Sequence, residues 1–152
     1  MALHHAKKMM TARLVDSLYT EAMVMADEAR GYFDEVGRGD RDLLEPVDRV
    51  AFSCESLKVT TRLMHVIAWL LTRKAIAAGE IREDDPGADA RRLGNDAESD
   101  LAAVGHLPGP AQAIIRSSMD LYDRVARIDR GLVDPEPESP ALGLIRRIEQ
   151  AL

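Results

Sequence analysis

The sequence predicts an all-α fold, an antiparallel three-helix bundle with a long acidic connection between its second and third helices and a short C-terminal amphipathic helix. Apolar residues return at helical spacing over three long segments, and glycine or proline stands near the ends of these segments. The chain has 152 residues, 46% of them hydrophobic, which suits one domain with a buried core. We therefore expect a bundle domain over 1–132, a tether over 133–140 and an amphipathic segment over 141–152.

The first helix is expected from about residue 8 to residue 36. Two apolar series, each with a spacing of seven, run along it and form the seam of a bundle helix. One series is Leu18, Met25 and Tyr32, and the other is Val15, Ala22, Ala29 and Val36. Gly37 and Gly39 are expected to stop this helix.

The second helix is expected from about residue 45 to residue 78, with Pro46 in its first turn and Gly79 as a left-handed cap. Two series with a spacing of seven again define one face. The large series is Val50, Leu57, Met64 and Leu71, and the smaller one is Val47, Cys54, Thr61, Ala68 and Ala75. We expect this face to be buried, so that Leu57→Ala or Leu71→Ala would cost about 2 to 5 kcal/mol.

The third helix is expected from about residue 110 to residue 130, ending at Gly131. Its core residues are Ile114, Ile115, Leu121, Tyr122, Val125 and Ile128. Residues 134–140 hold three prolines and three acids and predict a linker, after which Ser139 and Pro140 signal a short helix. The apolar face of that helix is Leu142, Ile145, Ile148 and Leu152. Docking on its own bundle is favoured over docking in the groove of another protein.

The connection over 80–107 is expected to be irregular, with a helical turn or two near 96–104. Residues 80–100 hold three basic and eight acidic side chains, which account for most of the formal net charge of −6. Such a charge can steer a basic partner, although a merely solubilising loop is the favoured alternative. The partner-binding candidates are Glu83, Asp84, Asp85 and Asp89 in the connection, with Leu142, Ile145 and Ile148 in the C-terminal helix.

Composition and motif searches argue against several functions. The net negative charge disfavours binding to nucleic acid or to an anionic membrane. The single cysteine excludes an internal disulfide and fits a reducing, cytoplasmic setting. No Glu-x-x-His pair, calcium loop or phosphate loop is found, so no catalytic, cofactor or metal residue is assigned. His65 is expected to hydrogen-bond across a helix interface, and Cys54 to be a buried structural thiol.

Three stretches resemble the RcdA family, regulators of CtrA degradation in alphaproteobacteria. They are SLYTEAMVMADEARGYFDE (17–35), FSCESLKVTTRLMHVIAWLLTRKAIAAGE (52–80) and LPGPAQAIIRSSMDLYDRVARIDRGL (107–132). The resemblance implies a three-helix bundle, commonly a homodimer, without enzymatic activity. It also implies an adaptor for the protease ClpXP that works with a CpdR-like response regulator and delivers cell-cycle regulators for degradation. Family members tend to extend past the bundle in a flexible tail, which is short here.

Two other functions stay open at this point. One is a structural bundle whose role depends on self-association only. The other is a bundle that binds a small ligand or a metal near His65 and Cys54.

Overall fold

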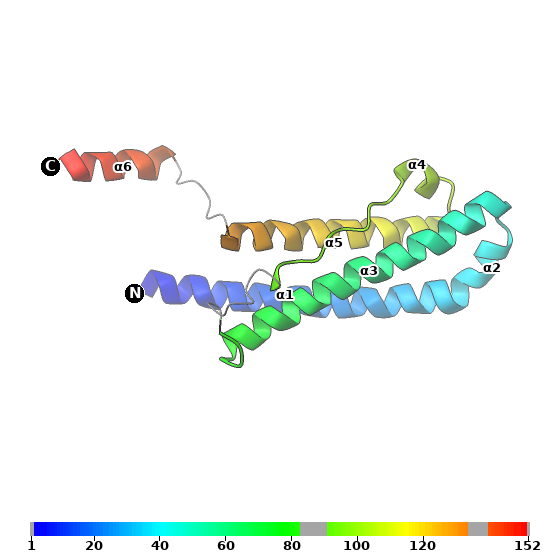
Figure 1. Cartoon of the computed structure of the whole chain (residues 1–152), viewed down its shortest axis with the longest axis horizontal. Helices are drawn as coiled ribbons and strands as arrows, with labels where there is room; N and C mark the ends of the chain where they lie inside the picture. Colours follow the sequence, from blue (N-terminus) through cyan, green and yellow to red (C-terminus); the bar gives the residue numbers. More distant parts are fainter. Residues whose placement is uncertain (1, 83–90, 134–139, 152) are drawn as a thin grey trace.

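The computed structural model describes residues 2–82, 91–133 and 140–151, with the side chains of 3–8, 10, 133, 140, 142 and 143 left aside. Its elements, in chain order, are α1 (Ala2–Gly31), the π-helical segment η1 (Tyr32–Val36), α2 (Gly37–Asp42), α3 (Pro46–Ala77), α4 (Leu101–Val104), α5 (Gly109–Val133) and α6 (Pro140–Ala151). Helices α1, α3 and α5 form an elongated three-helix bundle (Figure 1). The all-α bundle expected from the sequence is confirmed.

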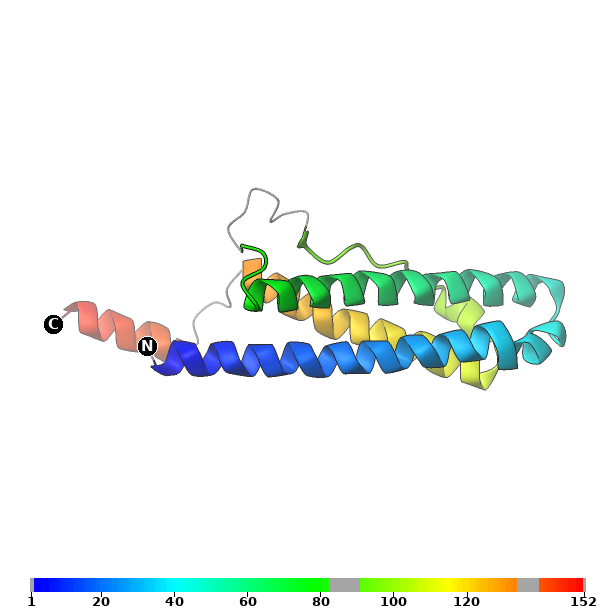
Figure 2. The same cartoon turned by 90° about the horizontal axis from the view of Figure 1, so that it is seen from below.

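The directions of the three helices explain the long connection. Helix α1 runs antiparallel to both α3 and α5, whereas α3 and α5 run parallel to each other (Figures 1 and 2). A parallel pair requires the chain to return along the whole bundle, and α3, with 32 residues, is about 48 Å long. The acidic connection makes this return and places α4 beside the start of α5. The expected antiparallel arrangement therefore holds for α1 against α3 and α5, but not for α3 against α5.

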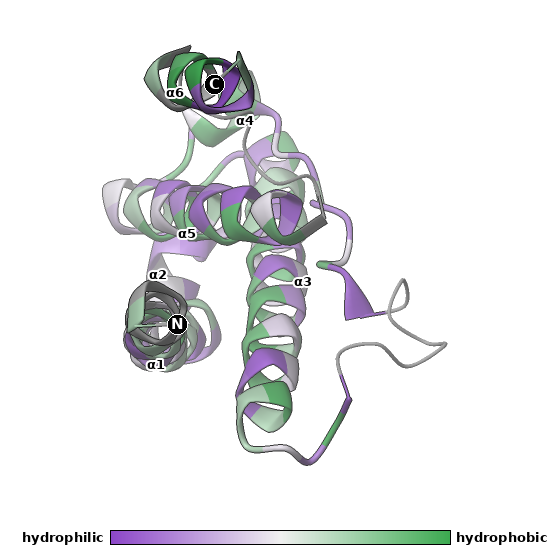
Figure 3. Cartoon of the chain, turned by 90° about the vertical axis from the view of Figure 1, so that its left-hand side faces the viewer, coloured by the Kyte–Doolittle hydropathy of each residue, from purple (hydrophilic) through white to green (hydrophobic). Residues whose placement is uncertain are grey.

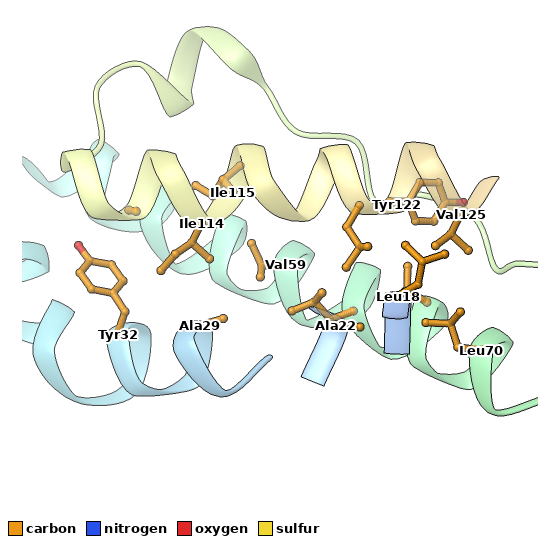
Figure 4. Packing of buried hydrophobic residues seen from close by; sticks show 14 of the residues in the cluster. Leu18, Ala22, Ala29, Tyr32, Val59, Leu70, Ile114, Ile115, Tyr122 and Val125 are labelled. Atoms are coloured by element: carbon orange, nitrogen blue, oxygen red, sulfur yellow. The ribbon is translucent and has the colours of Figure 1, made fainter. Parts of the chain in front are cut away.

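Viewed along the bundle, the three helices sit at the corners of a triangle (Figure 3). The core between them is apolar and continuous (Figure 4). From α1, η1 and α5, the buried residues that were expected are Val15, Leu18, Ala22, Ala29, Tyr32, Ile114, Ile115, Leu121, Tyr122 and Val125. On these three elements the spacing of apolar residues predicts the core face correctly, apart from the exposed Val36 of η1.

Gly37 and Gly39 do not stop the first helix, because helical structure continues from α1 through η1 and α2 to Asp42. Glycine only costs a helix about 1 kcal/mol per residue, and packing outweighs that cost. At Gly37 a Cβ would lie 2.7 Å from the carbonyl oxygen of Tyr32 and 3.0 Å from its ring, so glycine is what lets the chain pass. The Tyr32 hydroxyl then donates to Asp40 Oδ2 at 2.9 Å. Burial, followed by this carboxylate, raises the pKa of Tyr32 to about 12.

Two other helix ends differ from expectation. Helix α1 begins at Ala2 rather than near residue 8, and α5 continues through Gly131 to Val133. The start of α6 at Pro140 agrees with the signal in the sequence. Helix α6 lies beyond the end of α5, away from the bundle, and its described side chains are exposed (Figures 1 and 2). The favoured docking of α6 on its own bundle is therefore not seen in this arrangement.

Candidate protein-docking face

Helix α3 has a clear structural signal at each of its ends. Pro46 occupies the first turn, where its missing N–H leaves no partner unsatisfied. At the other end Gly79 has a φ of +77°, Gly79 N–H donates to Ile76 O, and Glu80 N–H donates to Ala75 O. These two bonds form a Schellman motif and confirm the cap expected at Gly79.

The inner face of α3 is centred on a buried arginine. Arg62 is fully buried, and its Nε donates to Asp96 Oδ1 at 2.8 Å. The same guanidinium donates to the carbonyl oxygen of Ala97 at 2.6 Å and to Ser118 Oγ on α5 at 3.2 Å. Glu55, about two turns earlier and 2% exposed, accepts a hydrogen bond from Ser99. These charges are thus buried with partners, which a buried charge requires.

The second half of the connection is anchored to the same face by further bonds. Trp69 Nε1 donates to Asp129 Oδ1 at 2.9 Å, and the other oxygen of Asp129 accepts from the backbone N–H of Leu93 at 3.3 Å. His65 Nδ1 lies 3.0 Å from Asn95 O, so this histidine bridges α3 and the irregular connection, whereas a bond across a helix interface was expected. Residues 91–100 are therefore part of the fold rather than a solvated loop, and some of their acidic groups are used internally.

Tyr122 of α5 also binds the connection. Its hydroxyl donates to Gly94 O at 2.5 Å. Burial raises the pKa of Tyr122, and the nearby carboxylate of Asp96 raises it further. A Cβ at Gly94 would lie 2.7 Å from the His65 ring, so the connection needs glycine to pass this close to α3.

The outer face of α3 carries the residues that the sequence assigns to the core. Val50, Leu57 and Met64 are 63%, 69% and 63% exposed, and each precedes by two residues a buried Phe52, Val59 or Val66. Two residues correspond to about 200° of helix rotation, so the two sets point in opposite directions. The expected burial of the large series is wrong. The reason is that α3 is apolar on both faces. Its buried face also contains Arg62 and Glu55, and these charged residues do not contribute to an apolar pattern.

We call this surface the α3 stripe. It comprises the exposed apolar residues Val47, Val50, Leu57, Met64 and Leu71 together with Cys54, which lies between them and is exposed. The expectation of a buried Cys54 thiol is therefore wrong for the same reason. Along the helix axis the stripe extends about 36 Å. Its members are spaced alternately by three and four residues from Val47 to Leu57 and by seven residues from there to Leu71, which is the spacing of a coiled-coil seam without its partner helix.

Two hollows flank the α3 stripe. One, of about 310 Å³, lies between α1 and α3 and is lined by residues that include Ala29, Phe33, Leu63, Met64 and Ile67. The other, of about 410 Å³, lies next to Val50, Cys54 and Leu57, with Arg41 and Arg49 at its edge. An exposed apolar surface with adjoining hollows and a charged edge is typical of a protein-binding site.

The residues predicted to bind partners are not brought together in the described part of the structure. Glu83, Asp84, Asp85 and Asp89, as well as the side chain of Leu142, lie outside the described residues. Ile145 and Ile148 lie on α6 and are 50% and 54% exposed. The sequence assigned the residues of the α3 stripe to the core, so the stripe was not predicted as a surface. The signal that could have corrected this is the spacing of seven between Glu55 and Arg62, which marks the opposite face of α3.

The geometry also bears on a ligand site at His65 and Cys54. These residues are eleven positions apart on α3, which separates them by about 16 Å along the helix axis, so they do not line a common site. Within residues 2–82, 91–133 and 140–151, no three His, Cys, Asp or Glu side chains are grouped so that they could hold a metal ion. No helix in these ranges is both long and apolar enough to cross a membrane.

Comparisons with known proteins give two matches of interest. Residues 6–152 match the family described as "Protein of unknown function (DUF1465)". The crystal structure of RcdA from Caulobacter crescentus CB15 is similar to this chain, with a TM-score of 0.62 and 31% sequence identity. The likeness covers 77% of this chain and 88% of that one. No curated protein matches the chain.

Proposed function

We propose that this chain, which belongs to the DUF1465 family and is related to RcdA, is a non-enzymatic adaptor in regulated proteolysis. The observation that carries the proposal is the α3 stripe, because a long apolar face with no cover in the described chain needs a protein partner. The buried polar groups of the inner face support a structural rather than a chemical role, since they are paired with each other.

The partners follow from the resemblance to the RcdA family. They are ClpX within the protease ClpXP, a CpdR-like response regulator, and cell-cycle regulators that are degraded. The setting is the cytoplasm of an alphaproteobacterium. Acidic residues of the connection, Asp84 and Asp85 among them, would contribute to the attraction of a basic partner.

A homodimer is the simplest way for the free protein to cover the α3 stripe. A stripe with coiled-coil spacing is self-complementary, and a twofold axis would place the same residues of two copies against each other. The mostly small series, with Cys54, Thr61 and Ala68, would let the two α3 helices approach closely beside Leu57 and Met64.

Light scattering over a wide concentration range tests the homodimer. The double variant Leu57→Asp/Met64→Asp should be a monomer where the unchanged protein is a dimer, because two carboxylates would be buried in the interface. Val24→Asp is a matched control, since Val24 lies on α1 and is also 63% exposed. A variant that dimerises as well as the unchanged protein would contradict this interface.

A pull-down with ClpX, a CpdR-like protein and candidate substrates tests the adaptor role. The unchanged protein should associate with at least one of them, and the Leu57→Asp/Met64→Asp variant should lose part of that association. If no association occurs under any condition, the adaptor role is wrong. A dimer that forms normally in that case would favour the second candidate, a bundle that serves self-association only.

A further inference from the structure

The end of the bundle carries a groove that the proposed function does not use. It has a volume of about 710 Å³ and lies between residues 11–16, in the first half of α1, and the ends of α3 and α5. Its apolar lining includes Val15, Trp69, Ile76, Ile128 and Leu132. Helix α1 extends past the ends of α3 and α5 at this end of the bundle (Figure 2).

Helix α6 has an apolar side without cover in this structure. Leu144, Ile145 and Ile148 are 60%, 50% and 54% exposed and share one side of the helix by their spacing. A helix of 12 residues is marginal in water unless its apolar side is packed. Helix α6 therefore needs a surface on which to fold stably.

The chain connects this helix directly to the groove. Leu132, one residue before the end of α5, is itself part of the lining. Six residues, 134–139, separate α5 from α6, and six residues span at most about 20 Å. Such a short connection gives α6 an effective concentration in the millimolar range at its own groove, far above that of a second copy.

We infer that the groove formed by α1, α3 and α5 at this end is a binding site for an amphipathic helix, and that its occupant in the free protein is α6 of the same chain. Docking turns α6 about 134–139 and makes it a fourth helix against Trp69, Ile128 and Leu132. This site is separate from the α3 stripe, and it does not depend on the adaptor role.

Hydrogen exchange of α6, read by mass spectrometry, tests the inference. In the full chain its amides should exchange at least about tenfold more slowly than in a synthetic peptide of residues 134–152. Ala12→Arg should restore the rate of the peptide, because Ala12 is an exposed residue of the groove wall and its replacement blocks the site without disturbing the core. Ala113→Arg, at an exposed position of α5 outside the groove, is the matched control and should leave the protection intact.

A disulfide trap in the Cys54→Ser background supplies a second measurement. On mild oxidation in air, Ala12→Cys with Leu144→Cys should give an internal disulfide, seen as a monomer on a non-reducing gel whose two thiols react with an alkylating reagent only after reduction. Exchange of α6 at the peptide rate in the full chain would overturn the inference. Protection that disappears on dilution, or a disulfide that links two chains, would assign α6 to the groove of a second copy and would overturn it as well. Association with ClpX is not part of either readout, so failure here is distinguishable from failure of the adaptor role.

Discussion

The two faces of α3 invert the usual distribution of residues in a helix. The inner face buries Arg62 and Glu55, whereas the outer face exposes Leu57 and Met64 to more than half of their surface. The inner face is acceptable because each buried charge has partners on the connection or on α5. The outer face has no such compensation in the described chain. Helix α3 thus has one face suited to contacts within its own chain and another suited to contact with a second protein.

The comparison also shows which kind of contact each face can provide. Hydrogen bonds to Arg62 fix the path of a connection that has little regular structure of its own, because their geometry is directional. Apolar contacts along the α3 stripe are less directional and suit a partner that binds and leaves. The inner face therefore determines the fold, and the outer face is available for association.

The largest expected effect is that of Arg62→Ala. Removing the guanidinium leaves Asp96 and the Ala97 carbonyl without their donor, which should lower the free energy of unfolding by about 3 to 5 kcal/mol in urea. Arg30→Ala is the control, because the Arg30 pair with Asp27 is exposed and should contribute about 0.5 kcal/mol or less. A loss for Arg62→Ala as small as that of the control would mean that the inner face is not what holds the connection.

The neighbours Leu70 and Leu71 offer the sharpest comparison of the two faces. Leu70 is fully buried, so Leu70→Ala should cost about 2 to 5 kcal/mol. Leu71 is 47% exposed, so Leu71→Ala should cost about 1 kcal/mol or less under conditions where the protein is monomeric. Equal losses in urea unfolding would place both faces in the core and would restore the register expected from the sequence.

A smaller effect on stability is expected at alkaline pH from Tyr122 of α5, whose hydroxyl donates to Gly94 O of the connection. Because the folded protein raises the pKa of Tyr122 above its ordinary value of 10, the folded state keeps this proton when the unfolded state loses it. Stability from this group is full below pH 10 and falls as the pH rises past 10. The unfolding midpoint of the unchanged protein should thus fall more steeply from pH 9 to pH 11 than that of Tyr122→Phe. Identical slopes would contradict a perturbed tyrosine at this place.

On α5 the spacing of apolar residues was sufficient to find the core, because its large apolar residues lie almost entirely on one side. On α1, which also exposes Leu14, Met23 and Val24, the two series with a spacing of seven still coincided with the buried face. Pro46 and Gly79 also fixed the limits of α3 to within a residue or two. Gly37 and Gly131 misled because glycine only weakens a helix, and tertiary packing decides whether the helix ends there. The partner residues expected in the acidic connection, Glu83, Asp84, Asp85 and Asp89, lie outside the described residues, and Asp96 of the same connection is used inside the fold.

By itself, the sequence determined that this protein is a bundle of three long helices and that it resembles the RcdA family. The tertiary structure decided which side of α3 is buried. The spacing of apolar residues indicates only which sides of a helix favour burial, and both sides of α3 do. The choice depended on Ser99, Asp96 and Ser118, which meet Glu55 and Arg62 only when the connection has folded back along the bundle.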